Sequence, residues 1–319
     1  MRIVFMGTPD FAVYSLKKLI ENNYNIVGVI TAVDQPAGRG KKIKMSAVKE
    51  FALEHKLNLL QPVNLKDPDF IEKLHALNAD IQIVVAFRML PAIVWDMPPF
   101  GTFNLHASLL PQYRGAAPIN HAIINGETET GLTTFFLDKE IDTGKIILQE
   151  KCSIDANDDF GSLHDKMMIL GAGLIIKTLE LIENKRHNSI AQSDLIGNST
   201  SLKPAPKIFK EDCKINWKLT AEEINNKIRG LSPYPTAYSY IQAVNGEQKY
   251  YVKIFNAEII DKTATFEKEG MVESDKKNYI HVKCKNGYIS IKELQIEGKK
   301  RMSTQDFLRG FDFSGKWSF

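Results

Sequence analysis

The N-terminal part of the chain alternates short apolar runs with amphipathic stretches, and this pattern limits the possible fold more than any other feature. Strands are predicted at 1–7, 25–31 and 80–87, and helices between them at 11–23, 46–56 and 69–78. The strand segments are short and apolar, and the helix segments repeat apolar residues at helical spacing. Strands that alternate with helices form βαβ units, so an α/β domain is expected, with a parallel sheet covered on both faces.

A second domain is predicted after this one. Residues 131–154 are typical of an antiparallel β pair with a turn at 142–144, and a helix is predicted at 162–183. The next segment is polar and contains Pro204 and Pro206. We therefore predict a catalytic domain at 1–188, a linker at 189–208 and a second domain at 209–319. The last is predicted to be a small OB-like β-barrel, because one short helix precedes several short β-like runs: 237–244, 250–260, 279–285 and 288–296.

The composition argues against several classes of protein. No apolar stretch approaches the roughly 20 residues of a membrane-spanning helix. The first apolar run reaches Gly7 and Pro9 within a few residues, and no secretory signal is visible. The cysteines, Cys152, Cys213 and Cys284, are odd in number and widely spaced, which indicates neither a disulfide framework nor a metal cluster. We expect a cytoplasmic protein without a metal site, whose cysteines are small buried side chains.

Charge is divided unevenly along the chain. Residues 1–202 carry 20 Lys and Arg against 23 Asp and Glu, whereas residues 203–319 carry 21 against 15. The C-terminal part is therefore basic, although the net charge of the whole chain is only +3. A basic domain fits an anionic partner such as nucleic acid, and a solvated lysine-rich surface explains the charge equally well.

The segment FNLHASLLPQYRGAAP, residues 103–118, places two polar residues in an apolar run. If the run is a strand, its period of two residues sends Asn104 and His106 to the same face. Pro111 and Gly115 then end regular structure, so the pair is expected near the carboxyl end of a strand, where open α/β sheets bind ligands. The alternative is that both side chains are structural and bond to the neighbouring backbone.

Asp142 adds a candidate catalytic carboxylate to this pair. Aspartate is common at turns for structural reasons, and the segment EIDTGK is a turn in this prediction. Beside Asn104 and His106, however, a carboxylate completes a set that can transfer an acyl group to an amine. The amide stabilises the developing oxyanion, the imidazole handles a proton, and the carboxylate orients or charges the imidazole. Neither serine nor cysteine is needed if the amine of the substrate attacks directly.

Two glycine-containing segments fall short of the known nucleotide-binding motifs. GTPDFA follows the first strand but lacks GxGxxG, and GRGKK lacks the full GxxxxGK[ST] of a P-loop. The second of these segments belongs to a long basic stretch, residues 33–49, between a predicted strand and a helix, where connections are usually short. Its basic residues include Arg39, Lys41, Lys42 and Lys44. They are expected either to contact nucleic-acid phosphates or to be simply solvated.

Six segments together resemble one family. They are GTPDFA, PAGRGKK, NLHASLLPQYRGAAPI, DTGKI, IRGLSPYP and GKKRMSTQDFLRG, and they cover nearly the whole chain. In this order the chain resembles the methionyl-tRNA formyltransferases. NxHxSLLPxxRG with DTG is specific to the folate-dependent formyltransferases, and PAGRGKK with RGLSPYP narrows the resemblance to the tRNA branch. The implied fold is a Rossmann-like N-terminal domain followed by an OB-like domain.

The resemblance also implies roles for individual residues. Asn104, His106 and Asp142 match the catalytic triad of the family. The segment matching its tetrahydrofolate contacts consists of Ser108, Leu109, Leu110 and Pro111. Arg39 matches the loop arginine that engages the acceptor end of the tRNA, and we extend this role to Lys41, Lys42 and Lys44.

The implied reaction is formyl transfer from 10-formyltetrahydrofolate to the α-amino group of methionyl-initiator tRNA, without a metal and by a monomer. Two alternatives stay open. A formyltransferase for a nucleotide-linked amino sugar or for glycinamide ribonucleotide would share NxHxSLLP, but would need neither PAGRGKK nor a basic second domain. An RNA-binding protein could keep the catalytic core only as a scaffold, although the intact Asn104, His106 and Asp142 argue against this.

The chain departs from the family pattern at one place. Where the family has a tyrosine-glycine pair and a longer turn, this chain has VVAFRMLP, with Phe87 and Arg88. No folate contact is therefore carried over to these residues. Arg88 is expected either to contact an anionic part of the folate or to face solvent.

Overall fold

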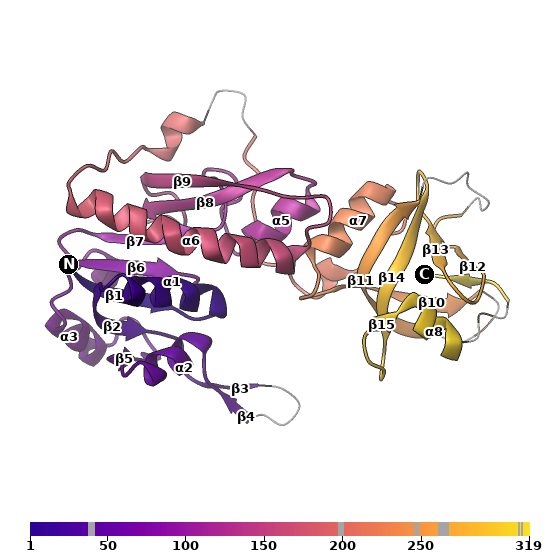
Figure 1. The fold of residues 1–319 in the computed structure, drawn as a ribbon, viewed down its shortest axis with the longest axis horizontal. Coiled ribbons are helices and arrows are strands. Elements are labelled where there is room, and N and C mark those ends of the chain that lie inside the picture. Colours follow the sequence, from indigo (N-terminus) through magenta and orange to yellow (C-terminus); the bar gives the residue numbers. More distant parts are fainter. Residues whose placement is uncertain are drawn as a thin grey trace. The chain divides into compact units, whose positions relative to one another are not determined.

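The structure is a computed structural model that describes residues 1–37, 42–196, 201–244, 246, 249–260, 268–311, 313 and 315–319. The chain divides into two compact units (Figure 1). Unit 1 contains residues 1–115, 129–153 and 164–204, and unit 2 contains residues 116–128, 154–163 and 205–319. The predicted boundaries at 188 and 209 remain a prediction. Each unit is therefore built from three separate segments of the chain.

Unit 1 is built on a seven-stranded, mostly parallel sheet, as predicted. Its strand order is β5 (Leu59–Leu60), β2 (Asn25–Ile30), β1 (Arg2–Gly7), β6 (Ile81–Val85), β7 (Thr102–His106), β8 (Glu129–Phe136) and β9 (Ile146–Ser153). The pairs from β5 to β7 are parallel, whereas β8 pairs antiparallel with both β7 and β9. The predicted hairpin around Asp142 is therefore confirmed, and the register of β8 places it beside β7.

The helices associated with this sheet are α1 (Asp10–Glu21), α2 (Ala47–Glu54), α3 (Pro68–Ala76), α4 (Ala92–Trp95) and α6 (Phe160–Glu183). The long helix α6 packs on β7 and β8. A Cβ added at Gly171 would lie 2.7 Å from Leu105, and Thr178 hydrogen-bonds Thr134 at 2.8 Å. The basic stretch forms a small hairpin that was not predicted, made of β3 (Gln35–Ala37) and β4 (Lys42–Lys44). A short 3-10 helix, η1 (Gln192–Leu195), follows α6.

Unit 2 contains an antiparallel, nearly closed barrel, as expected for an OB-like domain. Its strand order is β12 (Val272–Ser274), β13 (Ile280–Lys283), β14 (Tyr288–Ile296), β11 (Lys249–Ile260), β10 (Ala237–Ala243) and β16 (Trp317–Ser318), with β15 (Met302–Ser303) paired to β14. A bridge between Met271 and Ser318 joins the two ends of this order. The other elements of the unit are α5 (Pro118–Ile124), η2 (Glu211–Cys213), α7 (Ala221–Gly230) and α8 (Thr304–Gly310).

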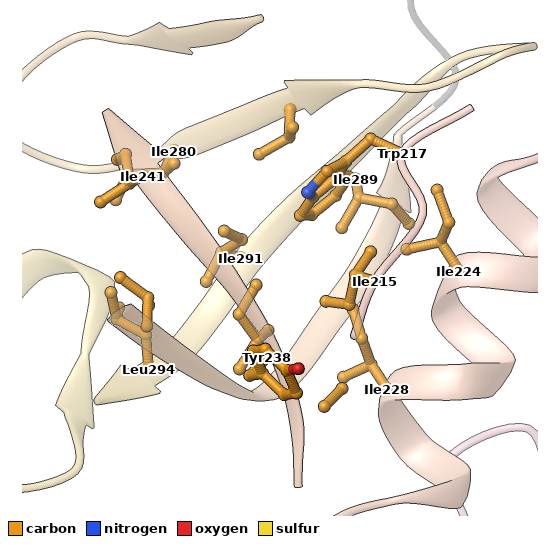
Figure 2. Packing of buried hydrophobic residues seen from close by; sticks show 14 of the residues in the cluster. Ile215, Trp217, Ile224, Ile228, Tyr238, Ile241, Ile280, Ile289, Ile291 and Leu294 are labelled. Atoms are coloured by element: carbon orange, nitrogen blue, oxygen red, sulfur yellow. The ribbon is translucent and has the colours of Figure 1, made fainter. Parts of the chain in front are cut away.

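The core of the barrel explains why these short strands fold together. Figure 2 shows Trp217 beside isoleucines from α7 and from the strands of the barrel. The indole N–H of Trp217 donates to Ser239 at 3.0 Å, so the polar group of this buried ring is satisfied. Helix α7 is fixed at its start by a capping box between Thr220 and Glu223. The predicted helix and strands of this domain are therefore confirmed.

The cysteines are all buried, as expected. Burial raises the pKa of the Cys284 thiol to about 12, so this side chain stays protonated at neutral pH. Within the described ranges, no cluster of His, Cys, Asp and Glu could hold a metal ion. Among the helices that the structure describes, none is long and apolar enough to cross a membrane.

Candidate active site

Strand β7 presents the two polar residues on one face, as its period predicts. Phe103 and Leu105 are buried, and Leu105 lies against Gly171 of α6. Asn104 and His106 therefore face away from α6. The strand ends at His106, and its parallel neighbour β6 ends beside it, with Val85 paired to Leu105. The pair thus lies at the carboxyl edge of the parallel strands, where ligands of such sheets bind.

His106 is held by a backbone carbonyl. Its Nε2 lies 2.9 Å from the oxygen of Tyr113, and the ring is 6% exposed. Because a carbonyl oxygen can only accept, Nε2 must carry the hydrogen of this bond. Nδ1 is therefore the ring atom that can take up a proton in the neutral form. The ring edge also meets Phe135, with 6.5 Å between the ring centroids.

Asp142 faces this free nitrogen. Its Oδ2 lies 3.8 Å from Nδ1 of His106 and accepts a hydrogen bond of 3.0 Å from the N–H of Gly115. A separation of 3.8 Å is too long for a direct hydrogen bond, but it places the carboxylate where it stabilises a protonated imidazole. Catalytic contacts are often looser before substrate binds. The structure therefore brings His106 and Asp142 close together, and their catalytic role stays a prediction.

Asn104 differs from these two residues because its amide is available. The side chain is only partly buried on β7. It forms no hydrogen bond with the part of the chain that the structure describes. An amide at the edge of the sheet, held by a strand but unused by the fold, can donate to a substrate oxygen. The site therefore combines a hydrogen-bond donor in Asn104, a proton carrier in His106 and a negative charge in Asp142.

The segment predicted to contact folate is tightly built into the fold. Ser108 is fully buried, and its hydroxyl donates to the Gln112 carbonyl at 2.7 Å. The side chains of Leu110 and Pro111 are also buried, whereas Leu109 is only partly buried. The folate role of Ser108, Leu109, Leu110 and Pro111 stays a prediction. The backbone of the segment is also used by the fold, since Thr133 bonds both the Leu110 N–H and the Ser108 carbonyl.

The predicted tRNA loop is only partly described. Arg39 and Lys41 lie outside the described residues, and Lys42 is placed in β4 without a described side chain. Lys44, also in β4, is exposed. Lys49, just beyond the hairpin, pairs with Asp34 at 2.6 Å, and this hydrogen bond together with one from Gln61 lowers the pKa of that carboxyl.

Arg88 has a role that neither sequence alternative foresaw. Its side chain is exposed, yet the guanidinium donates to the carbonyl of Val63 at 2.8 Å and also to that of Pro62. The turn after β6 starts with Ala86 at a φ of 47°, a left-handed conformation that costs alanine about 1–2 kcal/mol. Arg88 ties this turn to the segment before α3. These hydrogen bonds hold the turn after β6 and residues 62–63 together.

Replacing Arg88 by alanine is expected to loosen this turn. Loss of both hydrogen bonds should lower the free energy of unfolding by about 1 kcal/mol, because the group is partly solvated. If the turn borders the donor site, the KM for the formyl donor should also rise several-fold. Thermal unfolding and donor titration measure the two effects, with Arg309→Ala, at an exposed position of helix α8, as control. An unchanged melting temperature and KM would show that the Arg88 hydrogen bonds contribute neither to stability nor to donor binding.

Sequence reasoning missed three contributors to the site. The Tyr113 carbonyl and the Gly115 amide are backbone groups that no residue pattern reveals. Gln192 lies in the segment assigned to the linker, yet it is buried against the Asp142 turn. A lone polar residue in an aperiodic stretch gives no signal for such a contact.

Comparison with known proteins defines the class of enzyme first. Residues 1–179 match the formyl transferase family, and residues 207–312 match the formyl transferase C-terminal domain. A sugar 3N-formyl transferase, solved in the presence of dTDP and 5-N-formyl-THF, shares the fold with a TM-score of 0.63 at 23% identity, covering 94% of this chain and 99% of that one. The family match and the fold together are those of a formyl transferase.

Curated relatives are much more similar in sequence. A methionyl-tRNA formyltransferase of Flavobacterium johnsoniae is 54% identical, over 98% of this chain and 97% of the relative. The methionyl-tRNA formyltransferase of Bacteroides thetaiotaomicron is also 54% identical, over 98% of this chain and 97% of its own length. The chain belongs to the methionyl-tRNA formyltransferase family.

Proposed function

We propose that the protein transfers a formyl group from 10-formyltetrahydrofolate to the α-amino group of methionyl-initiator tRNA. Similarity to methionyl-tRNA formyltransferases over almost the full length supports this substrate. The single structural observation that carries the proposal is the approach of Asp142 to His106, which shares one face of β7 with Asn104. The product, N-formylmethionyl-tRNA, serves translation initiation, which places the enzyme in the cytoplasm. The monomeric state stays a prediction.

In the proposed reaction the neutral amine of methionine attacks the formyl carbon of the donor. A C–N bond forms, and the carbonyl oxygen becomes an oxyanion. Asn104 donates its amide N–H to this oxygen. The new bond leaves an extra proton on the amine nitrogen, and the pair of His106 and Asp142 takes it up at Nδ1 of the neutral imidazole. The imidazolium that results adds positive charge beside the oxyanion. The bond to the folate nitrogen then breaks, and the pair returns a proton to that nitrogen as tetrahydrofolate leaves.

The fold supports each of these tasks. Nδ1 of His106 can accept the proton because Nε2 is already committed to the Tyr113 carbonyl. Asp142 stabilises the imidazolium once it forms, and burial of the pair strengthens this effect. No step requires a nucleophile of the protein, since the amine attacks the donor itself. A metal is not part of the proposal.

Recognition of the tRNA is assigned to the basic loop and to the second unit. The loop residues Arg39, Lys41, Lys42 and Lys44 are proposed to contact backbone phosphates near the acceptor end, and the basic second unit to bind further phosphates. Such contacts release counterions, so affinity should fall steeply with salt. This binding would select one amine among the many in the cell.

Charge reversal in the loop tests this assignment. Changing Lys41, Lys42 and Lys44 to glutamate should weaken tRNA binding by about tenfold or more and reduce the salt slope by about one unit per lost phosphate contact. The control is Lys151→Glu, an exposed lysine of β9 whose ammonium pairs with Glu129. Filter binding at several salt concentrations measures both quantities. Equal affinities for the triple variant and the control would exclude the loop from tRNA binding.

A panel of acceptors tests the proposed reaction. The purified protein is incubated with 10-formyltetrahydrofolate and, in parallel, charged initiator methionyl-tRNA, free methionine or an amino-sugar nucleotide. Formylation of the charged tRNA alone is expected. Transfer only to the sugar nucleotide would keep the catalytic residues but change the substrate. Binding of tRNA without transfer to any acceptor would support the alternative of an RNA-binding protein without catalytic activity.

A further inference from the structure

We infer that Gln192 is a positioning residue that holds Asp142 in place for the proposed reaction; the inference rests on that proposed function. The side chain is 3% exposed. Its Nε2 donates to the carbonyl oxygens of Asp142 and Gly144, both at 2.9 Å. One amide group thus spans the turn that carries the candidate catalytic carboxylate.

The other end of the same amide joins a second part of the site. Oε1 of Gln192 accepts two hydrogen bonds from Arg114, at 3.0 Å from Nε and 2.6 Å from the terminal nitrogen. Arg114 lies between Tyr113, whose carbonyl holds His106, and Gly115, whose N–H donates to Asp142. A carboxamide is the side chain that offers both donors and an acceptor. Gln192 therefore links the segment that orients His106 to the turn that orients Asp142.

The Asp142 turn needs such support. Asp142 has a φ of 57°, a left-handed conformation that aspartate adopts more readily than most residues but less readily than glycine. Gly144 is held close to the end of β8, since a Cβ there would lie 1.7 Å from the Phe136 carbonyl oxygen. Gly144 fixes one end of the turn by close packing, and Gln192 fixes the Asp142 carbonyl by hydrogen bonding. Without the glutamine, Asp142 can relax away from Nδ1 of His106.

Gln192 is itself firmly placed. Two residues earlier, Ile190 exchanges a pair of backbone hydrogen bonds with Ile146 at the start of β9, each 2.9 Å long. This bridge fixes the chain entering η1 against the same hairpin that carries the Asp142 turn. The amide is consequently held on the sheet rather than on a free loop.

Replacing Gln192 by methionine removes the amide and keeps a side chain of similar size. The expected result is a kcat lowered by about tenfold to a hundredfold, because the carboxylate is misplaced, while KM for both substrates and the dissociation constant of the tRNA change less than about twofold. Gln192→Glu should also be impaired, since it accepts from Arg114 but offers no N–H to the two carbonyls. The control is Gln82→Met, a fully buried glutamine of β6.

A double-mutant cycle separates positioning from general support of the fold. If Gln192 acts through Asp142, adding Gln192→Met to Asp142→Asn lowers kcat by less than about twofold. The inference would be overturned if the kcat losses of the two single variants multiplied in the double variant. It would also be overturned if Gln192→Met lost tRNA binding to the same degree as kcat. Full kcat in Gln192→Met would overturn it as well. A wild-type protein that formylates no charged tRNA would instead refute the proposed function, so the two failures are distinguishable.

Discussion

Replacing Asn104 by alanine is expected to lower kcat by about a hundredfold to a thousandfold, the usual loss when one oxyanion donor is removed. The residue is fixed on β7 between β6 and β8, so its amide has a defined direction. The side-chain amide makes no hydrogen bond with the described residues, which leaves the donor for a substrate oxygen. Because the oxyanion exists only after the amine attacks, the loss should fall on kcat rather than on KM.

The measurement is steady-state formylation of charged tRNA with both substrates varied. Asn104→Asp gives a second expectation: a negative charge where an oxyanion forms should cost at least as much as alanine. Asn58→Ala serves as control, since this asparagine lies next to the edge strand β5 and is exposed. A kcat within tenfold of the wild type in both Asn104 variants would remove the residue from the oxyanion site.

Replacing Asp142 by asparagine is expected to lower kcat by about a hundredfold or more. The change removes the negative charge 3.8 Å from Nδ1 of His106 and keeps an oxygen that can accept from the Gly115 N–H. An imidazolium without this carboxylate is less stable, so proton transfer slows. Asp142→Ala should lose activity to a similar degree and also lower the free energy of unfolding by about 1–2 kcal/mol, because the Gly115 N–H loses its acceptor.

Formylation kinetics and thermal unfolding separate these two effects. The control is Asp138→Asn, an exposed aspartate in the same connection between β8 and β9, whose carboxylate accepts only from the next residue's N–H among the described contacts. If Asp142→Asn and the control both keep normal turnover, the carboxylate has no catalytic role. A loss confined to the alanine variant would indicate a structural role for the Gly115 contact.

Periodicity was sufficient to predict the sheet and one face of the site. The apolar runs ending at Gly7 and Phe87 form parallel strands because both of their faces are covered, and strict alternation in β7 places Asn104 beside His106. The basic half of the chain forms the predicted barrel for a related reason. Each of its short alternating runs has one apolar face, and the barrel buries these faces in a core that includes α7.

Features fixed by long-range contacts could not be predicted in this way. Asp142 reaches His106 because β8 pairs antiparallel with β7, a pairing that periodicity does not reveal. Helix α5 groups with the barrel because Asn120 donates to the Gly230 carbonyl at 2.8 Å, across 110 residues of sequence. The side chains of Gln192 and Arg88 hydrogen-bond to backbone carbonyls, and the sequence pattern does not predict contacts of this kind.

One measurement tests the central claim most directly: following a labelled formyl carbon from donor to product. 10-Formyltetrahydrofolate labelled with ¹³C in the formyl group is incubated with the protein and charged initiator tRNA, and the aminoacyl ester is then hydrolysed for mass spectrometry. The account predicts labelled N-formylmethionine in an amount equal to the tetrahydrofolate released, and none when Asn104→Ala is used over the same short time. Unlabelled methionine as the only amino acid recovered from the tRNA would contradict it.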